Sequence, residues 1–194
     1  MEIQDLPDRV RGGGQGLKLV FLGTKGYIDA VSGRHRRHST MRVEYEGRGF
    51  AIDCGEDWLG RVDELGGGAI LVTHAHPDHA FGLREGAPCP VYATRESWEK
   101  MQGFEIEDRH VVSPGRTVTI QGIRVRAFDV QHSTRAPAIG YRITAGRARI
   151  FYVPDLVYIR DRAEALDGVG IYIGDGATVE RSMVRKPGEE LIGH

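Results

Sequence analysis

The 194-residue sequence predicts a single α/β domain built on packed β-sheets. Short apolar or alternating segments recur along the chain, and 27 glycines supply tight turns between them. A few segments with helix signals are interspersed among these strands, and we find neither an internal repeat nor a low-complexity stretch. The length is sufficient to bury one substantial core, so we expect one domain of packed sheets with a few helices.

The predicted elements begin after a polar leader, residues 1–16, which contains three consecutive glycines and which we interpret as loose. The domain itself is predicted over 17–194. It opens with the apolar run 17–22, a buried strand that a glycine stops. The alternating segment 41–45 and the apolar segment 50–52 flank a glycine-containing turn, which is typical of a β-hairpin.

Further along the chain, apolar strands alternate with helices. Three glycines precede a fully apolar strand, and Thr94 is placed to cap a helix that a glycine ends. A Gln-Gly pair divides one long strand region into two, and an Ala-Gly pair separates the following two strands. We expect helices over 78–83, 95–102 and 160–166, and strands at 69–72, 90–93, twice within 111–130, and at 138–144, 149–153 and 170–173.

Charge and hydropathy argue against several classes of protein. The formal net charge is −1, so no global field favours nucleic acid or a membrane, and recognition of a polyanion would need a local patch. The acidic N-terminus lacks the apolar region of a signal peptide, and no apolar run approaches the ~20 residues of a membrane helix. We therefore expect a cytoplasmic protein without membrane contact, in which Cys54 and Cys89 remain free thiols.

The strongest chemical signal is the motif His-x-His-x-Asp-His, formed by His74, His76, Asp78 and His79 directly after an apolar strand. Residues two apart on extended backbone point to the same side, so His74 and His76 can hold one metal ion. A proline then turns the chain, so Asp78 and His79 can serve a second ion. Imidazole and carboxylate ligands suit Zn²⁺ and allow Mn²⁺ or Fe²⁺. A histidine-rich surface loop is the alternative. The apolar strand before the motif disfavours this alternative, because it places the motif in the loop at a strand end, where functional sites occur.

Two further candidate ligands lie downstream, each where an apolar strand ends. His132 follows the second strand of the 111–130 region, and Asp155 follows the strand at 149–153. Taken alone, each would more often be an ordinary strand-end residue than a ligand. Together with the first cluster, both are expected to be metal ligands, because strand ends display the side chains of functional sites.

These motifs resemble those of the metallo-β-lactamase superfamily, and most of all its tRNase Z and cyclic-phosphodiesterase branch. Residues 19–24 resemble the first strand and glycine turn of that branch, and 51–55 resemble the motif whose aspartate supports the metal loop. The segment 132–143 is similar to the third histidine motif, and Asp155 is similar to the aspartate that bridges two metals. The resemblance implies an α/β fold, the αββα sandwich, with its C-terminal strand and helix lacking from this sequence.

The resemblance also implies two Zn²⁺ ions per site, with Mn²⁺ or Fe²⁺ as alternatives. The implied ligand sets are His74, His76, His132 and Asp155 for one ion, and Asp78, His79 and Asp155 for the other. The superfamily adds one more histidine beyond the position that His194 matches, where this sequence stops. We therefore expect a fragment, a site that a homodimer partner or a second chain completes, or a depleted second site, and we favour the first two.

Two residues near the end of the sequence carry the expected acid chemistry. Asp175 lies in a segment that resembles the acidic motif orienting a catalytic histidine, and His194 lies in one that resembles the motif of that histidine. The resemblance implies that Asp78 orients a metal-bound hydroxide for in-line attack on phosphorus, while His194, oriented by Asp175, acts as general acid. The expected function is a dinuclear metal hydrolase, a phosphodiesterase acting on RNA or a small cyclic phosphodiester.

A basic loop gives the best indication of the substrate. It offers arginine forks and a hydroxyl that suit phosphate oxygens, from Arg34, Arg36, Arg37 and Ser39. A solvated charged loop is an equally weighted alternative. The long exosite arm of tRNase Z is not visible in the sequence, which weakens a role in tRNA processing.

Two other functions remain open from the sequence. An acyl hydrolase of the same fold, acting on a thioester, a lactone or a β-lactam, would use similar metal chemistry on a carbon atom. A non-catalytic metal-binding part of a split assembly is the second alternative, and the missing last ligand motivates it. Metal stoichiometry measured together with turnover separates these functions.

Overall fold

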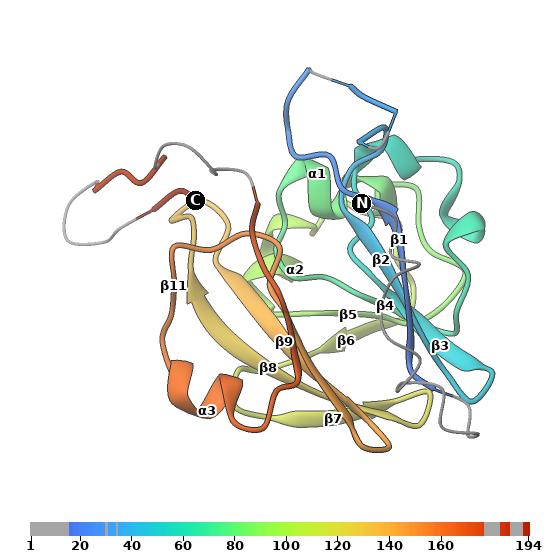
Figure 1. Ribbon diagram of the computed structural model, residues 1–194. Helices are drawn as coiled ribbons and strands as arrows, with labels where there is room; N and C mark the ends of the chain where they lie inside the picture. Colours follow the sequence, from blue (N-terminus) through green and yellow to red (C-terminus); the bar gives the residue numbers. More distant parts are fainter. Residues whose placement is uncertain (1–15, 30, 34, 177–182, 187–191) are drawn as a thin grey trace.

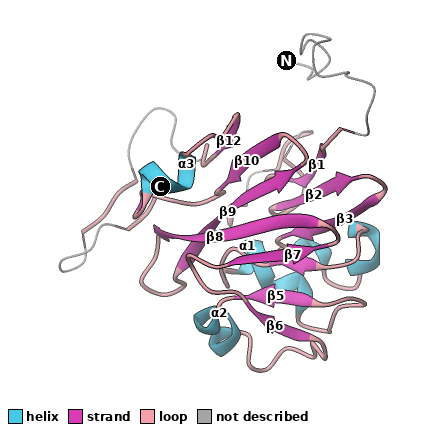
Figure 2. Ribbon diagram, turned by 90° about the horizontal axis from the view of Figure 1, so that it is seen from below, coloured by secondary structure: helices cyan, strands magenta, loops and turns pink. Residues whose placement is uncertain are grey.

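The structure is a computed structural model that describes residues 16–29, 31–33, 35–176, 183–186 and 192–194. Two β-sheets face each other, and short helices lie against their outer sides (Figures 1 and 2). The first sheet has the order β1-β2-β3-β4-β5-β6, and the second has the order β11-β8-β9-β10-β12 with β7 beside β8. This arrangement confirms the predicted α/β sandwich. The leader predicted over 1–16 lies outside the described residues except for its last glycine.

The first sheet is part antiparallel and part parallel. Its strands are β1 (Lys18–Gly23), β2 (Thr40–Tyr45), β3 (Arg48–Ile52), β4 (Ile70–Leu71), β5 (Val91–Ala93) and β6 (Arg109–Val111). The first three strands form an antiparallel meander, in which Glu46 and Gly47 close the β2–β3 hairpin with positive φ angles. Strands β3 to β6 pair in parallel, so their carboxyl ends lie at one edge of the sheet. The histidine motif leaves β4 at this edge.

The second sheet is antiparallel except for its last pair. Its strands are β7 (Thr117–Ile120), β8 (Ile123–Gln131), β9 (Ala138–Ala145), β10 (Ala148–Tyr152), β11 (Tyr158–Ile159) and β12 (Ile171–Ile173). Gln121 and Gly122 have φ angles of 51° and 80°, the left-handed turn that joins β7 to β8 tightly. Because β9 is antiparallel to both neighbours, β8 and β10 run in the same direction. His132 and Asp155 therefore leave the sheet at the same end.

The helices are short, and the first two α-helices begin at residues suited to that position. They are α1 (Pro77–Ala80), α2 (Arg95–Lys100) and α3 (Arg162–Leu166), together with 3-10 helices at Glu56–Trp58, Val62–Leu65 and Phe81–Leu83. A proline occupies the first turn of α1, where its missing N–H costs nothing. The Thr94 hydroxyl accepts a hydrogen bond of 3.2 Å from the Ser97 backbone N–H, which confirms the predicted cap of α2.

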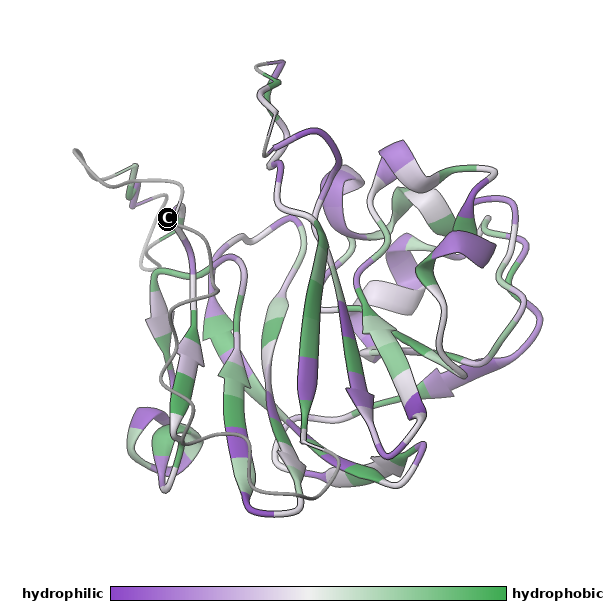
Figure 3. Ribbon diagram, turned by 45° about the vertical axis from the view of Figure 1, so that its right-hand side comes forward, coloured by the Kyte–Doolittle hydropathy of each residue, from purple (hydrophilic) through white to green (hydrophobic). Residues whose placement is uncertain are grey.

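Buried side chains form three layers. The largest cluster lies between the two sheets and includes Phe50 and Tyr141. A second cluster lies between the first sheet and the helices and includes Trp98 and Met101. A third cluster lies between the second sheet and α3 and includes Phe151. Apolar and polar residues alternate along many of the strands, as expected for sheets with two unlike faces (Figure 3).

The structure departs from the expected elements in several places. The strand expected over 69–72 is reduced to two paired residues, because the chain turns into the histidine loop at once. Strands β6 and β11 were not expected, since neither has a clear alternation in the sequence and each is defined by pairing with a neighbour. Helix α2 ends earlier than expected, at Lys100. No helix among the described residues is both long enough and apolar enough to cross a membrane.

Candidate metal centre

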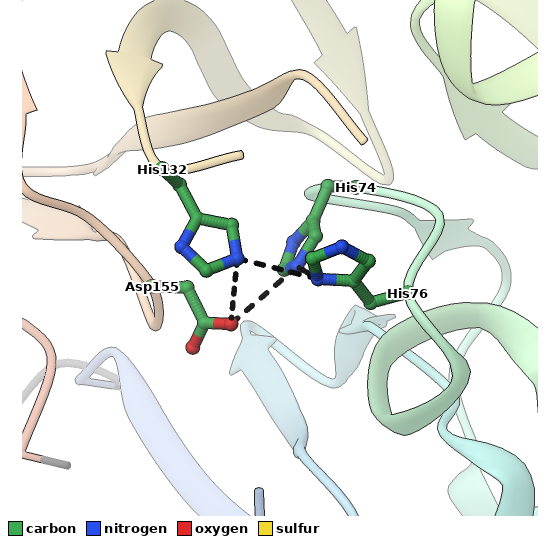
Figure 4. A group of neighbouring side chains, drawn as sticks. All are labelled: His74, His76, His132 and Asp155. Carbon is green, nitrogen blue, oxygen red and sulfur yellow. Dashed lines mark hydrogen bonds and ion pairs between the residues drawn. The ribbon is translucent and has the colours of Figure 1, made fainter. Parts of the chain in front are cut away.

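Three segments of the chain bring four candidate ligands together at one end of the sandwich. His74 and His76 follow β4, His132 follows β8, and Asp155 follows β10. Their imidazole nitrogens and one carboxylate oxygen point toward a common centre (Figure 4). The three segments are far apart in sequence, and they meet because the carboxyl ends of these strands lie at the same end of the two sheets.

The spacing of these four ligand atoms suits a tetrahedral ion. His76 Nδ1 lies 3.0 Å from His74 Nε2 and 3.2 Å from His132 Nε2. The Asp155 Oδ2 atom lies 3.4 Å from His74 Nε2 and 3.4 Å from His132 Nε2. Donor atoms held about 2.0–2.1 Å from a tetrahedral zinc ion lie about 3.4 Å from one another. This group therefore has the composition and the size of a zinc site.

Asp155 also belongs to a second group, with Asp78 and His79. The Nε2 atom of His79 is buried and makes no hydrogen bond, although Asp155 Oδ2 and Asp78 Oδ2 lie 3.3 and 3.4 Å away. An unsatisfied buried ring nitrogen is costly unless a ligand takes its lone pair. The second group therefore also fits a metal ion, and Asp155 is common to both groups.

The opposite nitrogens of three ligand rings are held by hydrogen bonds. His132 Nδ1 donates to the Gly193 carbonyl at 3.0 Å, and His79 Nδ1 donates to Asp53 Oδ2 at 2.8 Å. His74 Nδ1 lies 3.1 Å from the Thr73 hydroxyl. Such bonds fix the tautomer and the orientation of each ring. In this tautomer, the nitrogen facing the candidate ion is the one with the free lone pair.

Asp53 connects the histidine motif to the end of β3. Its carboxylate is fully buried and accepts hydrogen bonds from the backbone N–H and the hydroxyl of Thr73, at 2.7 to 3.0 Å, as well as from His79. Its φ angle of 63° is in the left-handed region, which is unusual for a residue other than glycine. The strained backbone aims the carboxylate at the metal loop and supports the ligands from behind.

The ionisation states of His76, His132 and Asp155 also suit metal binding. Burial, together with the neighbouring imidazoles of His74 and His132, lowers the pKa of His76 to about 3. Burial likewise lowers the pKa of His132 to about 4. Burial alone would raise the pKa of Asp155, but His79 and His74 hold it well below its ordinary value. Neutral imidazoles beside an ionised carboxylate are the forms that bind a divalent cation.

His194 lies against this centre together with Asp175. The His194 ring stacks edge-on against that of His132, with 4.9 Å between the ring centroids, and its Nδ1 atom donates to Asp175 Oδ2. This hydrogen bond raises the pKa of His194. Asp155, Asp175 and His194 also form a third group of close donor atoms. The structure thus brings His194 and Asp175 beside the expected ligands.

The loop between β1 and β2 lies beside the second group of donors. The position of a Cβ atom on Gly26 would be 3.9 Å from Asp78 Oδ2. The base of the loop is closed by a hydrogen bond of 2.9 Å from the Lys25 backbone N–H to the Arg37 carbonyl. Lys25 Nζ also pairs with Asp57 at 3.0 Å. The loop that the sequence identifies as basic is thus part of the wall of the candidate site.

The four residues expected to bind substrate have different surroundings. Arg36 is exposed and makes no ion pair with an acidic residue in the described part of the chain. Arg37 stacks over the Trp58 ring at 4.5 Å and lies 3.6 Å from a carboxylate oxygen of Glu64. Ser39 is buried. Arg34 lies outside the described residues. Of the three that the structure describes, Arg36 is the one that remains available to a phosphate.

Some supporting residues were not singled out from the sequence. Thr73 directly precedes the histidine motif, and its position was the signal that could have indicated its role. His38 and Asp57 hold each other through two hydrogen bonds, of 3.0 and 3.2 Å, that fix the loop beside the site. They lie 19 residues apart, so nothing in the sequence pattern connects them.

Comparison with known proteins agrees with this fold. Residues 48–191 match the model of the beta-lactamase superfamily domain. The chain therefore belongs to the beta-lactamase superfamily, which contains metal-dependent hydrolases of this fold. A ribonuclease Z of Methanopyrus kandleri is 30% identical over 87% of this chain and 71% of its own length. The Zn²⁺-bound PqqB structure from Methylobacterium extorquens has a TM-score of 0.62 at 20% identity, over 81% of this chain and 72% of that one.

A second curated relative matches a smaller part of this chain. The exodeoxyribonuclease WalJ of Streptococcus pneumoniae is 28% identical over 59% of this chain and 47% of its own length. This chain thus spans about half the length of that relative. The names of the two curated relatives both denote nucleases, whereas the structural likeness to PqqB concerns the fold alone.

Proposed function

We propose that this protein is a metal-dependent phosphodiesterase that acts on RNA or on a small cyclic phosphodiester. The observation that carries the proposal is the pair of donor groups that share Asp155, one with three histidines and one with Asp78 and His79. Two adjacent divalent ions suit phosphodiester hydrolysis, in which the attacking and leaving oxygens are both stabilised. Curated relatives named as a ribonuclease and an exodeoxyribonuclease support the same reaction class.

The proposed ligand sets assign two Zn²⁺ ions, with Mn²⁺ or Fe²⁺ as alternatives. One set is His74, His76, His132 and Asp155, and the other is Asp78, His79 and Asp155. When bound, such ions supply Lewis acidity, which activates water near neutral pH and stabilises negative charge on phosphoryl oxygens. The proposal includes a further donor to the second set, which comes from this chain or from a partner subunit. Measurements of metal stoichiometry and of sedimentation test this donor.

We assign the remaining catalytic and binding roles to Asp78, His194 and Arg36. Asp78, ionised and directed into the site, orients the attacking water as well as holding metal. His194 donates a proton to the leaving oxygen, because its hydrogen bond to Asp175 stabilises the protonated ring. Arg36 contacts a phosphate oxygen of the bound substrate. Together these residues bind the substrate, orient the water and supply the proton.

A paired assay tests the proposal. Bis(p-nitrophenyl) phosphate and a p-nitrothiophenyl thioester are offered to the Zn²⁺-loaded protein, and the metal content is measured by elemental analysis. We expect two metal ions per chain and turnover of the phosphodiester, with His76→Ala losing metal and turnover together. His110→Ala is the control. His110 is a half-exposed histidine on β6 that pairs with Asp108 and belongs to neither donor group.

The other outcomes of this assay identify the competing functions. Turnover of the thioester alone would assign an acyl hydrolase. Stoichiometric metal without turnover of either substrate would assign a binding component of a larger assembly. Full metal content in His76→Ala would refute the ligand assignment.

A further inference from the structure

The loop between β1 and β2 has an apolar tip that faces solvent. Tyr27, Ile28 and Val31 are 67%, 61% and 62% exposed, more than any other large apolar side chain in the described residues. Single exposed apolar residues are ordinary on a protein surface, but three within five positions form a small patch. A ligand that covers the patch removes its apolar surface from water, which stabilises the complex.

The position of the tip limits what can cover it. Tyr27 directly follows Gly26, and Gly26 is next to the Asp78 carboxylate, with 3.9 Å between Asp78 Oδ2 and the ideal Cβ position. Asp78 belongs to the second group of donor atoms. A group attached to a phosphate at this centre would therefore lie against the tip. The substrate itself is the molecule that these positions favour.

The ring of Tyr27 is supported on one side. It lies roughly parallel to the His38 imidazole, with a centroid distance of 6.2 Å and an interplanar angle of 27°. His38 is buried, and its backbone N–H donates to Asp57 Oδ2 at 3.0 Å while its carbonyl accepts from the Trp58 indole at 3.2 Å. Because His38 is fixed in this way, the inner face of the tyrosine ring has a rigid support and its outer face is open.

The charges around the tip indicate what kind of ring it would receive. Arg36, from the same loop, is exposed and makes no ion pair with an acidic residue in the described chain. An exposed aromatic ring and an exposed guanidinium on the same loop suit a nucleotide, whose base can stack while its phosphate meets the cation. A small acyl substrate offers neither group. This combination favours a nucleotide over the other substrates of a hydrolase with this fold.

We propose that Tyr27 is the stacking platform for the nucleobase next to the scissile phosphodiester. The proposal rests on the proposed function and makes it more specific, because it selects nucleotide-containing substrates over other phosphodiesters. Ile28 and Val31 extend the apolar contact around the base. Tyr27 contributes to substrate binding and takes no part in the bond-breaking step.

Fluorescence of 2-aminopurine tests the stacking without requiring turnover. A dinucleotide with 2-aminopurine on one side of its phosphodiester is titrated with the full chain in the presence of Zn²⁺. The titration is then repeated with a dinucleotide that carries 2-aminopurine on the other side. One of the two is expected to be quenched on binding, since stacking on an aromatic ring quenches this base. Tyr27→Ala should lose the quenching and about 10-fold in affinity, whereas Tyr27→Phe should retain both. Val111→Ala, an exposed apolar residue on β6, is the control and should behave as wild type.

An abasic substrate provides the second measurement. An oligonucleotide that lacks the base at the quenched position is compared with the intact one, with kcat and KM measured separately. Tyr27→Ala should raise KM for the intact substrate about 10-fold and leave KM for the abasic one unchanged. Equal losses on both substrates, or unchanged affinity and quenching in Tyr27→Ala, would overturn the proposal.

The two measurements also separate this proposal from the proposed function. Quenching that depends on Tyr27 without cleavage of any nucleotide would support the platform and refute the phosphodiesterase. Cleavage with no dependence on Tyr27 would refute the platform alone. Self-association that Tyr27→Ala abolishes, seen by sedimentation, would show that a second copy covers the tip and would also refute the platform.

Discussion

The Nδ1 atom of His79 donates a hydrogen bond of 2.8 Å to Oδ2 of Asp53, and both side chains are completely buried. Burial penalises the charged imidazole, but the Asp155 and Asp53 carboxylates outweigh it and raise the pKa of His79 well above its ordinary value. The same Asp53 carboxylate accepts the backbone N–H and the hydroxyl of Thr73. One buried carboxylate therefore orients a candidate ligand and holds the strand end that delivers the others.

Replacing this carboxylate should weaken metal binding. Asp53→Asn retains the shape of the side chain but removes its negative charge and one acceptor, so His79 loses its orienting partner. We expect the affinity for Zn²⁺ to fall about 10- to 100-fold, measured by competition with a chromogenic chelator. Asp108→Asn is the matched control, because Asp108 makes a 2.8 Å contact with His110 at the surface. Equal affinities in Asp53→Asn and wild type would contradict a supporting role.

Gly55 tests how closely the metal loop packs on the end of β3. Its backbone has φ and ψ angles of −68° and 170°, which any residue can adopt. A Cβ atom, however, would lie 2.2 Å from the Asp78 carbonyl oxygen and 2.3 Å from the Cβ atom of His38. We expect Gly55→Ala to lower the free energy of unfolding by about 1–3 kcal/mol or more through overpacking, measured by urea denaturation of the metal-free protein.

Gly103→Ala is the control for this steric effect. Nothing lies within 4 Å of a Cβ atom at Gly103, and its φ angle is not in the left-handed region. Its stability should equal or slightly exceed that of wild type. Similar stability of Gly55→Ala and Gly103→Ala would show that the contact between β3 and α1 is not tight.

Arg36 and Arg37 should respond differently to replacement. Arg36 is free for a phosphate, so Arg36→Ala should raise KM for a phosphodiester several-fold and leave the metal content unchanged. Arg37 stacks on Trp58, so Arg37→Ala should lower the free energy of unfolding by about 0.5–1 kcal/mol with a smaller change in KM. Steady-state kinetics and denaturation of both variants check this, and equal KM values for Arg36→Ala and wild type would make the loop an ordinary solvated one.

His194 should act on the rate rather than on metal binding. It lies outside both proposed ligand sets, and its ring is held by Asp175. We expect His194→Ala to lower kcat about 10²- to 10⁴-fold, as for the loss of a general acid, while two metal ions per chain remain bound. Substrates with a good leaving group, such as p-nitrophenolate, should lose less than those with an alkoxide leaving group. A parallel loss of metal would instead make His194 a ligand.

Much of the fold could be predicted because the relevant signals are local. The Glu46-Gly47 and Gln121-Gly122 turns, the cap at Thr94 and the alternation along the strands each involve neighbours in sequence. Strands β6 and β11 could not be predicted in the same way. They are two or three residues long and owe their conformation to hydrogen bonds with β5 and β8.

The sequence by itself determined the composition of the candidate site. The spacing of the motif from His74 to His79 indicates its donor residues. The ends of two apolar strands indicate His132 and Asp155. These conclusions need no long-range information, because residues two apart on extended backbone share a side and a strand end shows in the hydropathy.

The tertiary structure decided what these donors form together. It brings Asp155 within 3.4 Å of a histidine nitrogen in each donor group and ties two of the rings to Asp53 and Gly193. It places Gly26, which directly precedes Tyr27, next to the Asp78 carboxylate. It also distinguishes Arg36, which is exposed, from Arg37, which stacks on Trp58. Such relationships depend on how two sheets pack, since packing sets the distances between side chains far apart in sequence, and the order of residues alone does not contain them.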